Sequence, residues 1–277
     1  MTSIPNLTMN DGHTIPQLGF GVFQIPQDET QVAVTTALEA GYRLIDTAQG
    51  YRNEEGVGAA IAASDIPRDE LYITTKLTNS EQGYDKTLAA FDASMAKLGI
   101  DVLDLFLVHW PLPMFDQYVD TWRAFEKLQA DGRIRSIGVS NFEPEHFERL
   151  AAETGVVPAI NQVELHPQFP QIELRAYHEA HGILTESWGP IGQGKGLLEH
   201  EQIQAVAKAK GRRPAQVVLR WHLQQGFVVI PKSVNPERIR ENIEIFDFEL
   251  DGDDLAAIAK VDSGERLGPD PKTFAMR

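Results

Sequence analysis

The sequence predicts a (β/α)8 TIM barrel, formed by residues 1–277 as a single domain. Strand-like apolar runs alternate with amphipathic helical segments along the chain, as in parallel β/α folds. The length also fits, because α/β barrels often reach this size as one domain. In addition, three consecutive predicted strands end in ionisable residues. A parallel barrel gathers the carboxyl ends of its strands on one face, so these residues would meet in one site.

The N-terminal segment is predicted to contain a β-hairpin and the first barrel strand. Asn10-Asp11-Gly12 lies between two short extended runs, and Asp-Gly in this setting is a strong turn signal. We place this hairpin outside the barrel, where it closes the bottom. Residues 18–22 are predicted as the first barrel strand, with glycines that allow close backbone approach. Residues 30–40 have apolar side chains at helical spacing, and Gly41 is a suitable C-cap.

The rest of the chain continues this alternation. The other barrel strands are predicted at residues 42–46, 71–76, 103–109, 134–139, 159–163, 183–186 and 227–230. The remaining helices are predicted at residues 53–63, 85–98, 118–130, from 144 onward, 172–180, 201–210, 214–224 and 236–246, with a further short helix at 250–261. The short C-terminal tail, residues 262–277, is rich in Gly, Pro and charge and is expected to be a loop or partly disordered.

The composition excludes several classes of protein. A net charge of −15 argues against a nucleic-acid or anionic-membrane binder, because both need a basic surface. The absence of cysteine excludes disulfides, thiolate nucleophiles and Cys-ligated metals, and we predict no metal site. No apolar stretch approaches the roughly eighteen residues of a membrane span, and the N-terminus lacks signal-peptide features. We therefore expect a cytoplasmic protein.

Residues at neighbouring strand ends suggest proton-transfer chemistry. Asp46 ends one apolar run, and Tyr51 follows five residues later. Lys76 and His109 end the next two runs. A free tyrosine has a pKa near 10, so Tyr51 can act as the proton donor at neutral pH only beside a cation. A polar residue that opens a solvated loop is the simpler interpretation of any single strand end, but three in succession favour a catalytic site.

These strand ends belong to a series of motifs that resembles the aldo-keto reductases over nearly the whole chain. The short segments after His109 and at the C-terminus are most similar to the bacterial members typified by 2,5-diketo-D-gluconate reductase. The motifs are Gly41-Tyr42-Arg43-Leu44-Ile45-Asp46-Thr47-Ala48, Tyr51-Arg52-Asn53-Glu54, Thr75-Lys76-Leu77, Leu107-Val108-His109-Trp110-Pro111, Ile137-Gly138-Val139-Ser140-Asn141-Phe142, Asn161-Gln162-Val163-Glu164-Leu165-His166-Pro167 and Ile230-Pro231-Lys232-Ser233.

The resemblance assigns the same four residues, Asp46, Tyr51, Lys76 and His109, as a catalytic tetrad. It implies that NADPH delivers hydride to an aldehyde or ketone while Tyr51 protonates the oxygen. Keto-sugars and dicarbonyls are among the candidate substrates. An ammonium about 4 Å from the phenol would lower the pKa of Tyr51 by about three units at an effective dielectric near 20. That shift would bring Tyr51 near the working pH, with Asp46 holding Lys76 and a neutral His109 orienting the carbonyl.

The resemblance also implies how the cofactor is held. Three strand-end residues would flank the nicotinamide carboxamide: Ser140, Asn141 and Gln162. The alternative for each of these residues is that it only caps the end of its strand and binds no ligand. Trp188 would stack on the nicotinamide ring, although a packing role is the alternative. The loop after it would fold over the pyrophosphate through Gly189, Ile191 and Gln193. The segment after the last strand would bind the 2′-phosphate and adenine through Lys232, Ser233, Val234, Arg238, Glu241 and Asn242.

The residues themselves support a phosphate site after the last strand. Barrels often bind phosphate with the loop after strand eight and the helix N-terminus that follows. Residues 208–240 carry eight basic side chains and one acidic one in an otherwise acidic chain, although a solvated helix face is the alternative for residues 208–213. No G-x-G-x-x-G follows a strand, so a Rossmann domain is not indicated. Residues 189–196 resemble a P-loop but have Gly196 where Ser or Thr would bind magnesium.

One departure from the family bears on the substrate. Many relatives have tryptophan two residues after the catalytic lysine, whereas this chain has Thr78. We therefore expect a roomier or more polar pocket on that side. The tail near Leu267 is a further candidate wall. The other expected wall residues are Phe20, Phe23, Gln49, Thr78 and Trp110.

Two alternatives to a reductase remain open from the sequence. Lys76 at a strand end would also suit a Schiff-base aldolase, although this leaves Lys232, Ser233 and Arg238 without a role. A second alternative is a cofactor-binding redox sensor with little turnover, which the intact tetrad disfavours. We expect a monomer whose partner is a small carbonyl compound, with no nucleic acid or membrane partner.

Overall fold

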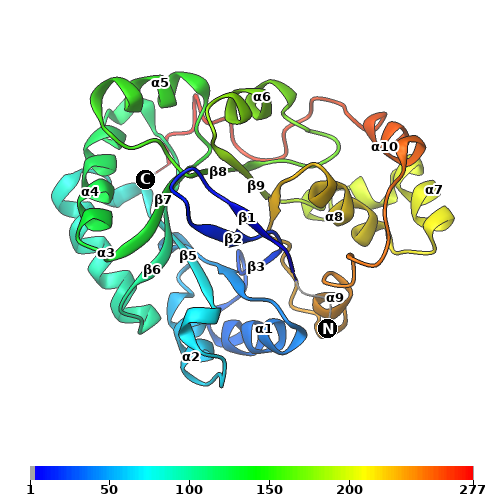
Figure 1. Cartoon of the computed structure of the whole chain (residues 1–277), viewed down its shortest axis with the longest axis horizontal. Coiled ribbons are helices and arrows are strands. Elements are labelled where there is room, and N and C mark those ends of the chain that lie inside the picture. The colour runs from blue at the N-terminus through cyan, green and yellow to red at the C-terminus, as the bar shows by residue number, and fades with distance from the viewer. Residues whose placement is uncertain (1–3, 277) are drawn as a thin grey trace.

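Eight parallel strands form the barrel wall (Figure 1). The structure of the protein, a computed structural model, describes residues 4–276. Hydrogen bonds from Val229 N to Gln17 O (3.0 Å) and from Gly21 N to Pro231 O (3.1 Å) join the first and last strands and close the barrel. The strands pair in chain order: β3 (Gly19–Gly21), β4 (Leu44–Asp46), β5 (Tyr72–Leu77), β6 (Leu103–Val108), β7 (Ile134–Ser140), β8 (Ile160–Glu164), β9 (Leu184–Trp188) and β10 (Val228–Val229). The predicted barrel is confirmed.

The N-terminal hairpin closes one end of the barrel. It consists of antiparallel strands β1 (Asn6–Thr8) and β2 (Thr14–Pro16), and in Figure 1 it crosses the middle of the barrel in dark blue. Met9 and Ile15 are buried in one cluster with Leu44 and Tyr72, the first residues of β4 and β5. The hairpin therefore covers the end where the strands begin, as predicted, and leaves their carboxyl ends free.

Helices surround the barrel and connect its strands. The helices are α1 (Gln27–Ala40), α2 (Glu54–Ala62), α3 (Tyr84–Leu98), α4 (Tyr118–Ala130), α5 (Pro144–Glu153), α6 (Ile172–Ala180), α7 (Glu201–Lys210), α8 (Pro214–Gln224), α9 (Pro236–Glu241) and α10 (Gly252–Ala259). The predicted boundaries are confirmed at both ends for α4, α6, α7 and α8. The predicted C-cap of α1 is also confirmed, since Gly41 has φ of 110°. Among residues 4–276, no helix has the length and hydrophobicity needed to cross a membrane.

Two helix boundaries differ from the prediction by three residues or more. α1 begins at Gln27, three residues before the predicted start at 30, because its first turn is polar and leaves no apolar periodicity to detect. The helix predicted at 236–246 ends at Glu241. The side-chain amide of Gln216 on α8 donates to the carbonyls of Glu241 (3.0 Å) and Glu244 (3.1 Å). A residue distant in the sequence thus provides hydrogen-bond donors for carbonyl groups at the end of α9.

The strands separate two apolar layers. Leu105 and Leu107 of β6 belong to the cluster inside the barrel, whereas Phe106 packs between the sheet and the helices. The ring of Phe106 stacks on Phe125 of α4 at 4.3 Å between centroids. Successive side chains of a strand therefore point to opposite faces of the sheet even where all of them are apolar. The same alternation directs Lys76 of β5 inward.

The C-terminal tail is a loop, which is one of the two states predicted for it, and it is tied to the barrel. Ser263 N donates to Gln168 O (3.1 Å), and Asn79 Nδ2 donates to Met276 O (2.8 Å). These contacts tie both ends of residues 263–276 to the barrel face that carries the strand carboxyl ends. The tail is held by groups distant in the sequence, so its own composition does not reveal its order.

Candidate active site

Lys76 is the centre of a buried polar cluster at the carboxyl ends of β4 and β5. Its side chain is fully buried, and Nζ lies 2.6 Å from Asp46 Oδ1. Nζ also donates to Thr47 O (2.9 Å) and to Tyr51 Oη (3.2 Å), which uses all three of its hydrogens. Although burial would lower the pKa of Lys76, Asp46 and Tyr51 raise it overall. The lysine therefore stays cationic beside the phenol.

Tyr51 comes from the short 3-10 helix η1 (Gln49–Tyr51), directly beyond β4. Its ring lies 5.8 Å from the His109 ring and 5.0 Å from the Phe23 ring, measured between centroids. Burial raises the pKa of Tyr51 above its ordinary value, and the opposing effect of Lys76 does not outweigh it. Our expectation that the cation brings this pKa near the working pH is therefore wrong for the structure described. Tyr51 keeps its proton at neutral pH, as a proton donor must.

His109 is a neutral imidazole at the end of β6. Burial and the neighbouring Lys76 charge lower the pKa of His109 to about 3. A neutral imidazole has one N–H donor, which suits hydrogen bonding to a carbonyl oxygen. The backbone of His109 is fixed by a bond from Asn141 Nδ2 to its carbonyl oxygen (3.0 Å).

The predicted carboxamide-binding residues lie together beside the tetrad. Ser140 Oγ donates to Gln162 O (2.7 Å) and accepts from Asn141 Nδ2 (3.0 Å). Trp188 Nε1 donates to Asn141 Oδ1 (2.8 Å), so the indole is fixed by the same cluster. Asn141 has φ of 62°, a left-handed conformation that is uncommon outside glycine and that often marks functional sites. Gln162 Nε2 donates to Asp46 Oδ2 (2.8 Å) and joins this cluster to the tetrad.

The predicted phosphate and adenine residues lie after β10. Arg212 and Arg213 pair with Asp247 and Glu241, but no ion pair among residues 4–276 involves Lys232 or Arg238. Two cations without acidic partners in an acidic chain are suited to an anionic ligand. Ser233 and Val234 lie between them in the chain, with Val234 exposed. Glu241 is engaged by Arg213, and Asn242 is buried at the end of α9.

The predicted pyrophosphate loop follows β9. Gly189 and Gln193 both have positive φ, 63° and 51° respectively, which folds residues 189–194 into a tight turn. Ile191 packs partly buried against the core, whereas Gln193 is exposed. Lys195 Nζ reaches across to Leu267 O of the tail (3.2 Å). The loop and the tail therefore touch on the face that carries the strand carboxyl ends.

The predicted pocket walls divide into two groups. Phe23 is 46% exposed beside Tyr51, and Trp110 packs on Phe274 of the tail at 4.4 Å. Phe23 is therefore accessible next to the phenol, whereas Trp110 is buried under the tail. Phe20, by contrast, is buried against Tyr42 in the layer between sheet and helices. The structure does not bring Phe20 to Tyr51, because Gly19 and Gly21 occupy the inward positions of β3.

The side chain of Gln49 also turns away from the tetrad. Its Nε2 donates to Ala90 O (2.7 Å) and Ser94 Oγ (2.8 Å) on α3, and its Oε1 accepts from Thr78 N (2.9 Å). Gln49 therefore fixes the loop that carries Thr78. Thr78 itself is partly exposed next to η1.

Two buried carboxyl groups near the site were missed from the sequence. Glu164 accepts hydrogen bonds from the backbone N–H groups of Leu267 (2.5 Å) and Gly268 (2.8 Å), and it anchors the tail. Glu186 lies within β9 and is fully buried. Glu164 stands two residues after Gln162 on the same strand face, so strand alternation could have indicated it. Glu186 could have been noticed because it is a charged residue within the apolar run that forms β9.

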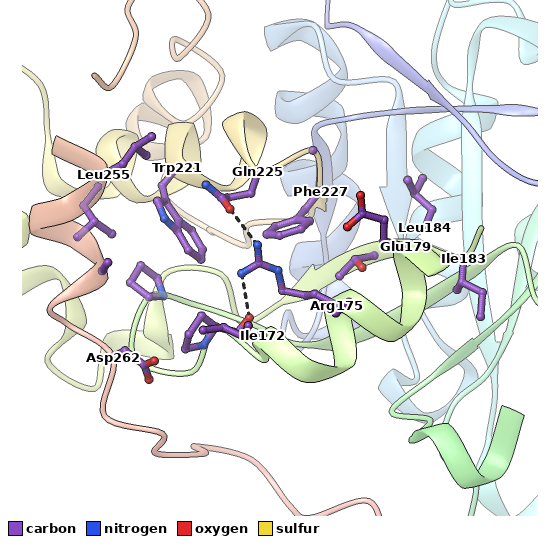
Figure 2. A pocket seen from close by; sticks show the side chains of 17 residues that line it. Ile172, Arg175, Glu179, Ile183, Leu184, Trp221, Gln225, Phe227, Leu255 and Asp262 are labelled. Carbon is purple, nitrogen blue, oxygen red and sulfur yellow. Dashed lines mark hydrogen bonds between the residues drawn. The ribbon is translucent and has the colours of Figure 1, made fainter. Parts of the chain in front are cut away.

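One groove of the surface lies away from the tetrad. Figure 2 shows this groove, about 740 Å³, between α6, α8 and α10 on the outside of the barrel, with no tetrad residue among its walls. Arg175 crosses it and donates to Gln225 Oε1 (2.9 Å) and Pro170 O (3.2 Å). Its guanidinium also lies over the Phe227 ring at 4.5 Å. Arg175 thus links α6 to α8, which accounts for its position without a ligand.

Comparison with known proteins agrees with this geometry. The family model described as "Aldo/keto reductase family" matches residues 17–263. An aldo-keto reductase of Mycolicibacterium smegmatis is 58% identical over 270 residues, which cover 98% of each chain. The methylglyoxal reductase DkgA of Escherichia coli K12 is 50% identical over 269 residues, 97% of each chain.

Solved structures give the same result. The crystal structure of Gox0644 without ligand has a TM-score of 0.94 and 52% identity, covering 99% of each chain. A mutant of Gox0644 in complex with NADPH has a TM-score of 0.94 and 51% identity, again covering 99% of each chain.

Proposed function

Because this chain belongs to the aldo/keto reductase family, we propose that its strand-end site reduces a carbonyl compound with NADPH, with Tyr51 as the proton donor. One observation carries the proposal for the site. Lys76 Nζ lies between Asp46 Oδ1 (2.6 Å) and Tyr51 Oη (3.2 Å), and the His109 ring lies 5.8 Å from the Tyr51 ring, measured between centroids. This arrangement fixes a proton donor beside a permanent cation in a buried site.

The residues present fit an NADPH molecule. Lys232 and Arg238 offer unpaired positive charge for the 2′-phosphate, and Ser140, Asn141 and Gln162 offer polar groups at the strand ends for the carboxamide. Trp188, held by Asn141, offers a flat ring for stacking. The bound cofactor supplies a hydride, that is, the two electrons that reduce the carbonyl carbon.

The protein residues then manage the oxygen and its proton. Tyr51, protonated at neutral pH, gives its proton to the carbonyl oxygen as negative charge develops there. Lys76 stabilises the resulting phenolate, and Asp46 keeps the ammonium in place. Neutral His109 donates a hydrogen bond that orients the carbonyl. The phenolate regains a proton from solvent before the next turnover.

The aldolase alternative conflicts with the state of Lys76. A Schiff base needs a neutral amine, whereas Asp46 and Tyr51 keep this lysine charged and use its three hydrogens. The sensor alternative is disfavoured, because Asp46, Lys76, Tyr51 and His109 lie together as a reductase needs.

We propose small dicarbonyl compounds as the substrate class. DkgA, a methylglyoxal reductase, is 50% identical to this chain. We propose Phe23, which lies beside Tyr51, and Trp110, which packs on Phe274 of the tail, as apolar walls and Thr78 as a polar one. A cytoplasmic location and a monomeric state remain proposals from the sequence.

The test is NADPH oxidation at saturating cofactor with methylglyoxal, matched monocarbonyl aldehydes and keto-sugars. We expect the highest kcat/KM for the small dicarbonyl, and NADH to be a poorer cofactor. Equal rates for dicarbonyls and monocarbonyls would contradict the substrate class. NADPH binding without reduction of any carbonyl would contradict the reaction and favour the sensor.

A further inference from the structure

Glu186 is a buried carboxyl group in the barrel interior, below the tetrad. It lies in the middle of β9 and is 0% exposed. In the sheet register it stands opposite Gln162 of β8 and Val228 of β10. Among residues 4–276, no donor lies in hydrogen-bonding geometry to either of its carboxyl oxygens. An ionised carboxylate without donors in an apolar interior is costly, so the geometry favours the neutral acid.

Gln162 connects this buried acid to the catalytic cation. Its Nε2 donates to Asp46 Oδ2 (2.8 Å), and Asp46 Oδ1 accepts from Lys76 Nζ (2.6 Å). Lys76 in turn donates to Tyr51. An amide that donates through its nitrogen still has an acceptor oxygen, and a carboxylic acid can donate to it. A neutral Glu186 can therefore donate to the amide oxygen of its register partner, which a carboxylate cannot do.

We propose that Glu186 is a positioning residue that, as a neutral acid, orients Gln162 toward Asp46 and, when it ionises in alkaline solution, holds the proton on Tyr51. This inference rests on the proposed function of Tyr51 as proton donor. It gives the site a second negative charge that is absent at neutral pH and present at alkaline pH. The reductive direction, which needs a protonated Tyr51, would then persist to higher pH.

The electrostatics of the interior agree with this arrangement. Burial and the nearby Asp46 charge raise the pKa of Glu186 to about 8, with Gln162 and Lys76 opposing. The titratable groups facing Glu186 are Asp46 from β4, Lys76 and Tyr72 from β5, and Tyr51 from η1. The flanking strand β10 contributes only the apolar Val228 at this level.

The sign of the effect on Tyr51 follows from the charge. A negative Glu186 raises the pKa of Tyr51 and that of Lys76. Glu186→Gln keeps the size and polarity of the side chain but never gains the charge. Tyr51 would then lose its proton at lower pH in the variant than in the wild type. We expect the buried unit charge on Glu186 to raise the pKa of Tyr51 by about one unit.

The kinetic test is the pH profile of kcat for carbonyl reduction in Glu186→Gln. We expect the alkaline fall in kcat to move to lower pH by about one unit, with near wild-type kcat at pH 6.5. The control is Ser136→Ala, which removes a buried interior hydroxyl and no charge. Ser136→Ala should leave the alkaline limb in place. An unchanged limb in Glu186→Gln, or a uniform loss of kcat at every pH, would overturn the proposal.

A spectroscopic test separates this proposal from the proposed function, because it needs no turnover. Difference infrared spectra of the wild type should show a protonated carboxyl band at pH 7 that disappears as the pH passes about 8. The band should be absent from Glu186→Gln. If that variant does not fold, the wild-type titration decides alone, since a fully ionised spectrum at pH 7 would overturn the proposal.

Discussion

Asp46 Oδ1 lies 2.6 Å from Lys76 Nζ, and both side chains are buried. Removing one partner of a buried ion pair leaves an uncompensated charge, which typically costs about 3–5 kcal/mol. For Asp46→Asn we expect a loss of about that size in the free energy of unfolding, together with at least a hundredfold fall in kcat, the lower range for a general acid. Urea unfolding and steady-state kinetics measure the two effects.

The matched control for Asp46→Asn is Asp131→Asn, which breaks the exposed pair between Lys127 and Asp131. Exposed pairs contribute about 0–1 kcal/mol, so this variant should keep wild-type stability and activity. Equal stability of the two variants would contradict the structural importance of the buried pair.

Arg238 should distinguish NADPH from NADH. Arg238→Gln removes a cation without an acidic partner, so we expect the KM for NADPH to rise at least tenfold while the KM for NADH changes little. A charge-assisted hydrogen bond contributes about 1.5–3 kcal/mol, and about 1.4 kcal/mol corresponds to tenfold. Arg240→Gln on the same helix is the control, since its guanidinium bonds to Pro236 O. If Arg238→Gln and Arg240→Gln changed the KM values for NADPH and NADH to the same extent, Arg238 would not be the residue that distinguishes the two cofactors.

Gly268 should be essential for docking of the tail. A Cβ at this position would lie 2.5 Å from Trp188 Cη2 and 2.9 Å from Glu164 Oε2, so Gly268→Ala must displace the tail. We expect faster proteolysis of the tail and a higher KM for the carbonyl substrate, because Phe274 then leaves Trp110. Gly252→Ala, where nothing lies within 4 Å, is the control. Unchanged proteolysis in Gly268→Ala would show that the tail does not dock as described.

Buried histidines should make the protein sensitive to acid. Burial lowers the pKa of His109 and His178 to about 3 and that of His222 to about 4. The unfolded chain binds protons near pH 6.5 while these folded histidines do not, so stability falls as the pH drops below 6.5. Glu186 acts in the opposite sense between about pH 4.5 and 8. Asp104 and Glu143, whose pKa values burial raises, act with it, whereas His146, whose pKa burial lowers, adds to the effect of the other histidines.

Denaturant titrations at pH 7, 6 and 5 measure this loss of stability directly. The free energy of unfolding should decrease at each step toward acid. His222→Gln should flatten the decrease, since one proton-binding difference is then removed. A free energy that is constant from pH 7 to 5 would contradict the neutral assignment of the buried histidines.

The barrel and the tetrad geometry were predictable because their signals are local. An apolar run ends where the chain leaves the barrel, so Asp46, Lys76 and His109 are visible as strand ends without knowledge of the strand order. Parallel topology then brings them together. The helices with clear apolar periodicity, such as α4 and α8, were predicted to the residue for the same reason.

The parts that were not predictable depend on direction or on distant contacts. Strands buried on both faces read as continuous apolar runs, so the sequence does not show that Phe20 faces the helices. Nor does it show that Gln49 turns toward α3. The order of the tail depends on Glu164, 103 residues before Leu267. Glu186 lies within an apolar strand, and the residues that surround it come from other strands, so its surroundings cannot be predicted from the local sequence.

The central claim is that Tyr51 donates the proton, and its most direct test is Tyr51→Phe under single-turnover conditions with bound NADPH. The variant keeps the ring contacts with Phe23 and His109 and loses only the hydroxyl. We predict a fall of about 10²–10⁴-fold in the rate of carbonyl reduction, with unchanged NADPH affinity. Tyr84→Phe, at a partly exposed tyrosine on α3, should leave both quantities unchanged. Full turnover by Tyr51→Phe would contradict the account.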